Sequence, residues 1–229
     1  MKKAFLVLLP LLFFGASTFA QEHDSKWGAW YMYFLNHQIQ DSKFGIQADV
    51  QYRDWQLGGD FQQSILRGAL TYQPIPEIKA AFGYSYFVNG PEGNAKTTSM
   101  EHRIFQDINF PQKVGSFMSL NHRLRLEERW VEDQDFRTRV RYAAAFTIPI
   151  TKNEHGATGF YFAIFDEIFI NGQTHIGNGR EVGLFDRNWL YGALGYALSK
   201  NLKVQLGALN QVTENSVKNN LQVSLIHSF

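Results

Sequence analysis

Apolar and polar residues alternate one by one along most of this chain. In the segment that begins at Phe44, for example, Ile46 and Val50 are separated by Gln47 and Asp49, and similar stripes recur up to Phe229. Successive side chains of a β-strand point to opposite faces, so this period predicts strands with one apolar and one polar face. We therefore expect an all-β protein.

The alternating segments predict eleven long strands. Each spans about ten to fifteen residues, longer than the usual five or six of soluble sheets. That length suits a strand that crosses a bilayer at a tilt and extends beyond it. The expected strands are 27–40, 44–56, 61–73, 78–89, 98–110, 116–130, 136–150, 159–171, 185–199, 202–212 and 218–229.

The segments between these strands alternate in length. Short turns are expected at 41–43, 74–77, 111–115 and 199–201, and longer Gly- and Asn-rich loops at 90–97 and 172–184. Short turns at one end and long loops at the other are typical of outer-membrane barrels. A soluble barrel or sandwich is the alternative, because it shows the same alternation with its apolar face turned inward.

Three features favour the membrane barrel. The polar stripes carry several charges per strand, and the chain ends at Phe229 after an alternating apolar strand, which resembles the terminal assembly signal of bacterial outer-membrane barrels. Tyrosines and tryptophans also collect near strand ends, as interfacial girdles require. These residues are Trp27, Trp30, Trp55, Tyr72, Trp130 and Trp189.

We therefore predict a transmembrane, antiparallel, up-and-down β-barrel of ten to twelve strands. Single-chain bacterial barrels have even strand numbers, so eleven segments leave two possibilities. Either residues 21–40 contain a further strand, or one segment is not part of the wall. Twelve is the preferred number.

The first twenty residues have the composition of a secretory signal peptide. A cationic start at Lys2 and Lys3 precedes an apolar stretch, and small residues lead to a cleavage site after about Ala20. The alternative is a membrane anchor, but the stretch is interrupted by Pro10 and is marginal for spanning. The expected organisation is a signal at 1–20 and a barrel at 21–229, exported to the bacterial outer membrane.

Composition excludes several classes of function. The 229 residues contain no cysteine, which excludes a disulfide scaffold, a thiolate zinc site and a cysteine nucleophile. Without Lys2 and Lys3 the chain has 20 basic and 21 acidic residues, a net charge of −1. A nucleic-acid partner is not expected, because binding phosphates requires a basic surplus.

The clustered charges all lie at odd positions, which places them on one face of the predicted wall. Seven arginines against four carboxylates leave a local surplus of three positive charges. The predicted charge network of the lumen comprises Glu101, Arg103, Asp107, Arg123, Arg125, Glu127, Arg129, Arg137, Arg139, Arg141 and Glu167.

Antiparallel pairing predicts which of these charges meet. A turn centred near residue 113 places Glu101 opposite Arg125, and a loop centred near 133 places Arg125 opposite Arg141. A turn centred near 154 then places Arg141 opposite Glu167. The expected row is therefore two arginines flanked by two glutamates, with Glu127 and Arg139 paired beside it, together with Arg103 opposite Arg123.

Two roles follow for this network. Paired charges can fill and rigidify a narrow lumen, since a desolvated charge is tolerated when it is paired. Alternatively, the arginine surplus can attract small anionic solutes in a pore or binding barrel. The expected partners are outer-membrane lipids, the outer-membrane assembly machinery acting on the strand that ends at Phe229, and a small anionic solute. No cofactor is expected.

An outer-membrane lipid-modifying hydrolase is the alternative function, although no catalytic constellation is evident. His102 and His122 lie nearest the network but at even positions, so they should face outward, with His102 opposite Tyr84. A hydrolase needs a nucleophile and an orienting group near its base, and none can be placed there. The other histidines lack metal-ligand spacing, and the Gly-rich segments open no helix that could hold phosphate.

Taken together, several phrases resemble a bacterial outer-membrane β-barrel family that is catalogued only as a domain of unknown function. The resemblance covers essentially all of the mature chain. It implies the fold and the location but no activity, and Trp189 departs from the Arg or Leu-like residue usual there. The phrases are Trp27 with Tyr31 and Phe34, Gln51 to Arg53, Gln63 to Tyr72, Glu101 to Ile104, His122 to Arg129, Arg139 to Tyr142, Glu167 to Asn171, Asn188 to Gly192, and Gly207 to Gln211.

Overall fold

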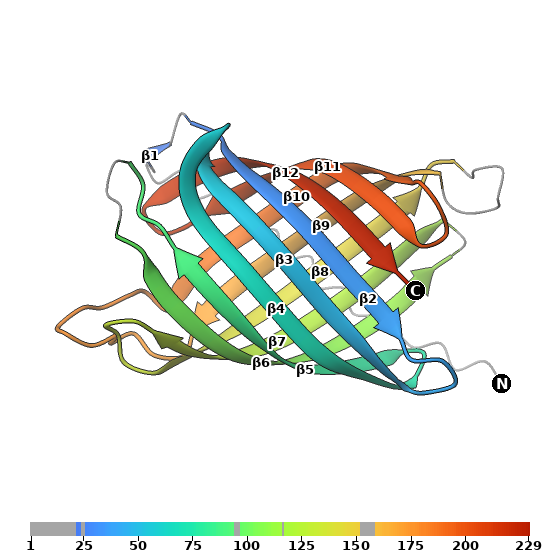
Figure 1. The fold of residues 1–229 in the computed structure, drawn as a ribbon, viewed down its shortest axis with the longest axis horizontal. Helices are drawn as coiled ribbons and strands as arrows, with labels where there is room; N and C mark the ends of the chain where they lie inside the picture. The colour runs from blue at the N-terminus through green and yellow to red at the C-terminus, as the bar shows by residue number, and fades with distance from the viewer. Residues whose placement is uncertain (1–21, 24–25, 94–96, 116, 152–158) are drawn as a thin grey trace.

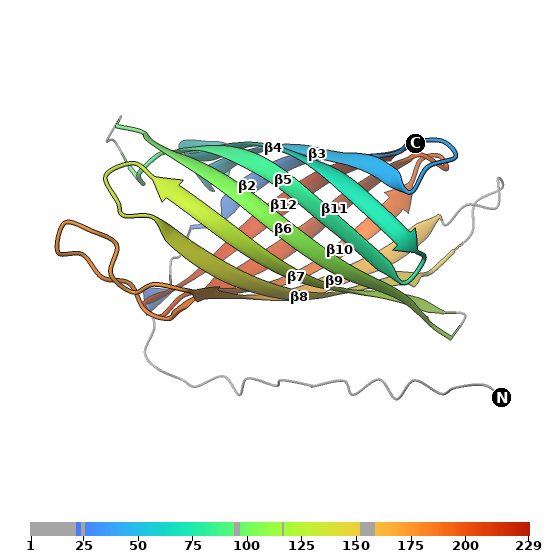
Figure 2. The same cartoon turned by 90° about the horizontal axis from the view of Figure 1, so that it is seen from below.

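The computed structural model shows a closed β-barrel built from long, strongly tilted strands (Figures 1 and 2). It describes residues 22–23, 26–93, 97–115, 117–151 and 159–229. The predicted signal peptide at 1–20 lies outside the described residues. No helix in the described part of the chain is long and apolar enough to cross a membrane.

The described residues form a sheet of twelve strands. The eleven long strands follow one another around the wall in chain order, which confirms the all-β fold expected from the alternation. The strands are β1 (Glu22–His23), β2 (Gly28–Gln38), β3 (Phe44–Gln56), β4 (Gly59–Ile75), β5 (Ile78–Asn89), β6 (Ser99–Val114), β7 (Met118–Val131), β8 (Arg137–Pro149), β9 (Phe160–Asn171), β10 (Phe185–Ala197), β11 (Leu202–Val212) and β12 (Ser216–Ser228).

The barrel closes by parallel pairing of its first and last long strands. Each other neighbouring pair of long strands is antiparallel, so in an eleven-strand wall β2 and β12 necessarily run in the same direction. Of the two possibilities left open by the eleven predicted segments, the first is observed: the segment 21–40 contains a further strand. That strand, β1, pairs with Ser216 and Val217 on the edge of β12 that β2 continues from Asn220 onward. It raises the total to twelve without adding a position to the wall, so the expectation of an even number of wall strands is wrong.

The apolar stripe of each strand faces outward. On β7, Leu124 and Leu126 are 46% and 41% exposed, whereas Arg125 between them is 4% exposed. This is the reverse of a soluble barrel, which buries its apolar face. An apolar outer surface around a polar interior is compatible with a surrounding bilayer.

Each end of the barrel carries five of the connections between the long strands. The end that holds Phe229 carries the connections 39–43, 76–77, 115–117, 150–159 and 198–201, and we call it the turn end. The opposite end carries 57–58, 90–98, 132–136, 172–184 and 213–215, and we call it the loop end. The expected separation holds in part, because 150–159 at the turn end is long and 57–58 and 213–215 at the loop end are short.

Exposed aromatic side chains lie near both ends of the wall. Ring pairs Phe44–Tyr72 and Phe160–Tyr196 lie toward the turn end, and Trp130–Phe136 lies toward the loop end. Such rings suit a membrane interface.

Two of the predicted girdle residues belong instead to the interior. Trp30 is 1% exposed and stacks edge-on with Trp189, with ring centroids 5.2 Å apart. Trp30 lies on the same face of β2 as the buried Met32. Its closeness to the strand end therefore did not suffice to predict a place at the membrane interface. Closeness to a strand end does not decide which face a side chain occupies.

The parallel closure predicts a specific cross-link. Tyr33 of β2 and Leu225 of β12 are direct partners on the outer face, so Tyr33→Cys combined with Leu225→Cys should form a disulfide within one chain. The chain has no other cysteine, so non-reducing electrophoresis of the refolded barrel gives a clean readout.

The matched control combines Tyr33→Cys with Leu221→Cys. Leu221 pairs with Ala29, about 13 Å along the strand from the partner of Tyr33, and should not cross-link. Equal cross-linking of both pairs, or of neither, would contradict the observed closure.

Candidate functional site

The eleven charged residues expected on one face do lie inside the barrel. Ten of them are less than a tenth exposed, and the side chain of Arg123 is 25% exposed. They come from four neighbouring strands, β6 to β9, because alternation places every second residue of a strand on the inner face.

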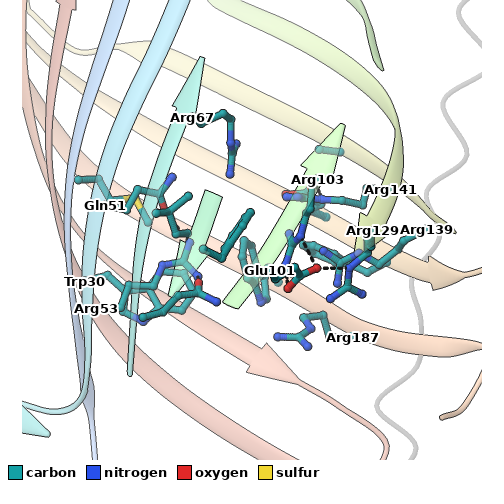
Figure 3. A pocket seen from close by; sticks show the side chains of 18 of the residues that line it. Trp30, Gln51, Arg53, Arg67, Glu101, Arg103, Arg129, Arg139, Arg141 and Arg187 are labelled. Atoms are coloured by element: carbon teal, nitrogen blue, oxygen red, sulfur yellow. Dashed lines mark hydrogen bonds and ion pairs between the residues drawn. The ribbon is translucent and has the colours of Figure 1, made fainter. Parts of the chain in front are cut away.

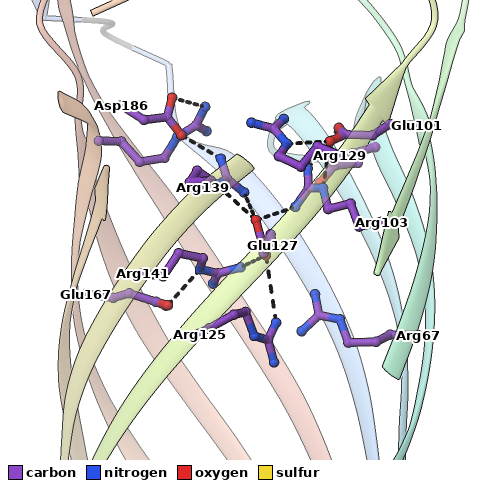
Figure 4. Close-up of polar contacts among 12 residues, drawn as sticks. Arg67, Glu101, Arg103, Arg125, Glu127, Arg129, Arg139, Arg141, Glu167 and Asp186 are labelled. Carbon is purple, nitrogen blue, oxygen red and sulfur yellow. Dashed lines mark hydrogen bonds and ion pairs between the residues drawn. The ribbon is translucent and has the colours of Figure 1, made fainter. Parts of the chain in front are cut away.

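Glu127 on β7 is the centre of the ion-pair network (Figure 4). Its Oε2 accepts hydrogen bonds from Nη2 and Nε of Arg139 at 2.6 and 2.9 Å, and its Oε1 accepts one from Nη1 of Arg141 at 2.7 Å. Arg103 and Arg125 lie within ion-pair distance, at 3.6 and 4.0 Å. One carboxylate that is 1% exposed therefore serves four guanidinium groups.

Two further carboxylates each join arginines of neighbouring strands. Glu101 accepts hydrogen bonds at its Oε1 from Arg103 at 2.7 Å and from Arg129 at 2.6 Å, and its Oε2 accepts a further one from Arg103 at 2.9 Å. Glu167 accepts from Arg123 at 2.6 Å and Arg141 at 2.8 Å. Glu101 thus links β6 to β7, and Glu167 links β9 to both β7 and β8.

Asp107 differs in that it hydrogen-bonds to a single arginine, which it binds through both of its oxygens. Nε and Nη2 of Arg125 donate to the two oxygens at 2.6 and 2.7 Å. This bidentate pair is the strongest geometry available to an arginine and a carboxylate.

The expected pairing between the sixth and seventh strands is wrong. Glu101 lies opposite Val131, and Arg125 lies opposite Asp107. The turn was expected at 111–115, but β6 continues through Pro111 to Val114. Proline is tolerated there because β5 pairs with β6 only as far as Asn109, which leaves Pro111 with a neighbouring strand on one side only.

Because the turn lies later in the chain than expected, the expected pairing of Arg103 with Arg123 is also wrong, and Arg103 lies opposite Arg129. Between β7 and β8 the expected register is observed, with Arg125 opposite Arg141 and Glu127 opposite Arg139. Between β8 and β9 the register differs by two residues.

Arg141 consequently faces Phe169, and Glu167 faces Ala143. The continuous row from Glu101 to Glu167 is therefore not formed. Slips of an even number of residues preserve the face, which is why the same side chains still meet inside the barrel.

The structure adds five charged residues that the predicted network lacked. Arg67 lies 3.6 Å from Asp49, and Asp186 accepts hydrogen bonds from Arg139 and Arg187. Arg53 is the fifth. The positions of Asp49, Arg53 and Arg67 follow from the same alternation extended to β3 and β4, so the sequence did contain this signal.

Asp186 could not be found in that way. A register shift between Phe185 and Arg187 interrupts the alternation in β10 and brings two consecutive charged residues to the interior. Single-residue irregularities of this kind leave no clear trace in a period-two pattern.

Together these residues form an arginine–carboxylate network with unequal charge. Ten arginines stand against six carboxylates, which leaves four positive charges unmatched. The members are Asp49, Arg53, Arg67, Glu101, Arg103, Asp107, Arg123, Arg125, Glu127, Arg129, Arg137, Arg139, Arg141, Glu167, Asp186 and Arg187.

Most of the unmatched charge lies near the loop end. Seven arginines and four carboxylates occur within four residues of the loop end of their strands. Deeper in the barrel, Arg67, Arg123 and Arg125 stand against Asp49 and Asp107. The charges near the loop end are Arg53, Glu101, Arg103, Glu127, Arg129, Arg137, Arg139, Arg141, Glu167, Asp186 and Arg187.

Aromatic rings hold several of these guanidinium groups in place. Arg103 lies 3.7 Å from the ring centroid of Phe87, and Arg53 lies 3.8 Å from that of Trp30. The guanidinium of Arg125 lies 4.2 Å from the ring centroid of Phe105. Stacking of a guanidinium on a ring face fixes its plane while leaving its N–H edges available.

The network surrounds a cavity of about 450 Å³ in the lumen (Figure 3). Nine arginines but only two glutamates line it. No residue of the long loop 172–184 lines the cavity, and this loop is instead hydrogen-bonded to the connection 132–136 through Asp135 and Ile176. A second cavity of about 160 Å³ shares Arg67 and Arg123 with the first.

The two histidines considered for hydrolysis form hydrogen bonds with tyrosines on the outer face. Nδ1 of His122 pairs with the hydroxyl of Tyr142 at 2.8 Å, and His102 pairs with the hydroxyl of Tyr84. In register His102 lies opposite Tyr86 rather than Tyr84, which corrects the expected pairing. Within the described residues, no cluster of three or more potential metal ligands was found.

The central position of Glu127 predicts a large effect of its removal. Glu127→Gln leaves up to four buried guanidinium groups without their shared counter-charge, which should lower the free energy of unfolding by about 3–5 kcal/mol. Denaturant titration of the refolded barrel, followed by tryptophan fluorescence, measures this change.

Glu77→Gln is the matched control, because Glu77 is exposed in the turn between β4 and β5. It should unfold like the unaltered protein. If both variants were equally stable, the network would not support the fold in the way described.

Comparisons with known proteins identify a family and an uncharacterized relative. The chain is 28% identical over 167 residues to an uncharacterized protein of Methylorubrum extorquens, covering 72% of this chain and 69% of that protein. No solved structure matches it. The model of the family described as "Protein of unknown function (DUF2490)" matches residues 27–222. This chain therefore belongs to that family of unknown function.

Proposed function

We propose that this protein is a bacterial outer-membrane barrel that draws small anionic solutes into its arginine-lined lumen and passes them through it. The observation that carries the proposal is the excess of four positive charges in the network around the cavity, three of them near the loop end. In the part of the chain that the structure describes, Arg53 and Arg137 have no carboxylate oxygen within 4.0 Å, so the excess does not follow from the needs of ion pairing alone.

A confined charge of one sign acts strongly on solutes. Low-dielectric walls focus its field, which raises the local concentration of oppositely charged solutes and the rate at which they enter. Rings of arginine or lysine select anions in pores for the same reason. Carboxylated and phosphorylated solutes suit the planar fork of donors that arginine presents.

Two features support a location in the outer membrane. The wall exposes apolar side chains, and exposed aromatic rings lie near both ends. We propose that lipids surround the wall, that the assembly machinery recognises the last strand, and that the segment 1–20 is a signal removed on export.

The structural role of the network is compatible with this proposal. The bidentate pair of Arg125 and Asp107 and the shared carboxylate of Glu127 rigidify the wall, while the unmatched arginines face the cavity. Hydrolysis has less support, because the outward histidines contact tyrosines and not a nucleophile.

Conductance of the refolded chain, residues 21–229, in a planar bilayer under a salt gradient tests the proposal. We expect discrete steps with a reversal potential that favours anions. Replacing Arg53 and Arg137 together by glutamine removes two of the four unmatched charges and should shift the reversal potential toward zero.

Lys200→Gln removes one charge from an exposed turn at the other end of the barrel and serves as the control. Its reversal potential should match that of the unaltered protein. A folded protein without conductance, or with a preference for cations, would contradict anion passage.

A further inference from the structure

We infer that the lumen binds solutes carrying two separated anionic groups, one held by Arg53 and the other by Arg137. This inference rests on the proposed entry of anions into the lumen and specifies which anions bind best. Its simplest representatives are short dicarboxylates with a carboxylate at each end.

Arg53 is a buried cation without a counter-ion. It is 7% exposed, and its Nη1 and Nη2 donate to the side-chain oxygens of Gln63 at 2.9 Å and Gln51 at 2.6 Å, both neutral. Its Nε has no hydrogen-bond partner. A guanidinium has five N–H donors, so three remain available for an anionic group.

Arg137 is the corresponding residue on β8. It is 8% exposed, lines the cavity and also has an Nε without a partner. Within the described lumen, Arg53 and Arg137 are the two arginines with no carboxylate oxygen within 4.0 Å. A buried charge without a partner is costly, and an anion beside each would remove that cost.

The two arginines lie on opposite walls of the lumen. In the ring of eleven long strands, β3 and β8 are five strands apart in one direction and six in the other. Arg137 lies directly opposite Arg129 in the pairing of β7 with β8. Figure 3 shows Arg53 and Trp30 on one side of the cavity and Arg129 and Arg187 on the other.

This arrangement favours a ligand that spans the lumen. A solute with one anionic group can neutralise only one of the two arginines. A solute with two groups neutralises both, provided that its backbone is long enough to reach across the cavity. The ring of Trp30 fixes the plane of the Arg53 guanidinium, so one end of the ligand meets a preorganised donor.

Calorimetric titration of the refolded barrel with dicarboxylates of three to eight carbons tests the inference, with monocarboxylates of the same lengths as comparison. We expect an optimum at one chain length, where the dicarboxylate binds about tenfold tighter or more than its monocarboxylate. Arg53→Gln and Arg137→Gln should each abolish this optimum, and Lys200→Gln should retain it.

Arg53→Lys separates loss of charge from loss of folding. It keeps the cation but removes the fork of donors, and it should weaken the optimum without abolishing anion entry. Circular dichroism confirms that each variant retains the barrel.

The outcomes distinguish this inference from the proposed function. Anion-selective conductance without a length optimum would overturn the two-point site and leave anion passage standing. An optimum that persists in Arg53→Gln or Arg137→Gln would also overturn it. Absence of anion selectivity would remove the basis of both.

Discussion

The cost of burying charge inside a narrow barrel is the constraint on which this structure depends. Ten arginines line or support the lumen, and each must be paired, stacked or left available to an anion. Glu127 offsets this cost for four of the ten arginines, because one carboxylate at the centre contacts arginines of β6, β7 and β8. The neighbouring carboxylates extend the network to β9 and β10. Ion pairing thus links five consecutive strands through their side chains as well as through the backbone ladder.

Ion pairing and anion attraction share the same lumen. Each of the deeper arginines, Arg67, Arg123 and Arg125, has a carboxylate within 4.0 Å, whereas the arginines near the loop end outnumber the carboxylates there by three. Paired charges stabilise the wall without a strong field, and unmatched charges of one sign produce one. The same residue type therefore serves two purposes, according to how many carboxylates its surroundings supply.

Much of this could be predicted from the sequence, because a period of two specifies the face of every strand residue. Arg139 and Arg141 were placed inside the barrel by parity alone, and the register of β7 with β8 followed from their loop. Three features escaped prediction for local reasons. Pro111 does not end its strand, the irregularity before Arg187 brings Asp186 inside, and the parallel closure depends on an odd number of strands. None of these leaves a clear trace in the period-two pattern of the sequence.

The most direct test of the account is a crystal structure of the refolded barrel grown in bromide, with anomalous scattering used to locate the ions. We expect bromide in the lumen beside Arg53 and Arg137, where no carboxylate neutralises the guanidinium groups. Anomalous peaks confined to the outer surface, with none in the cavity, would contradict the claim that its unmatched arginines hold anions.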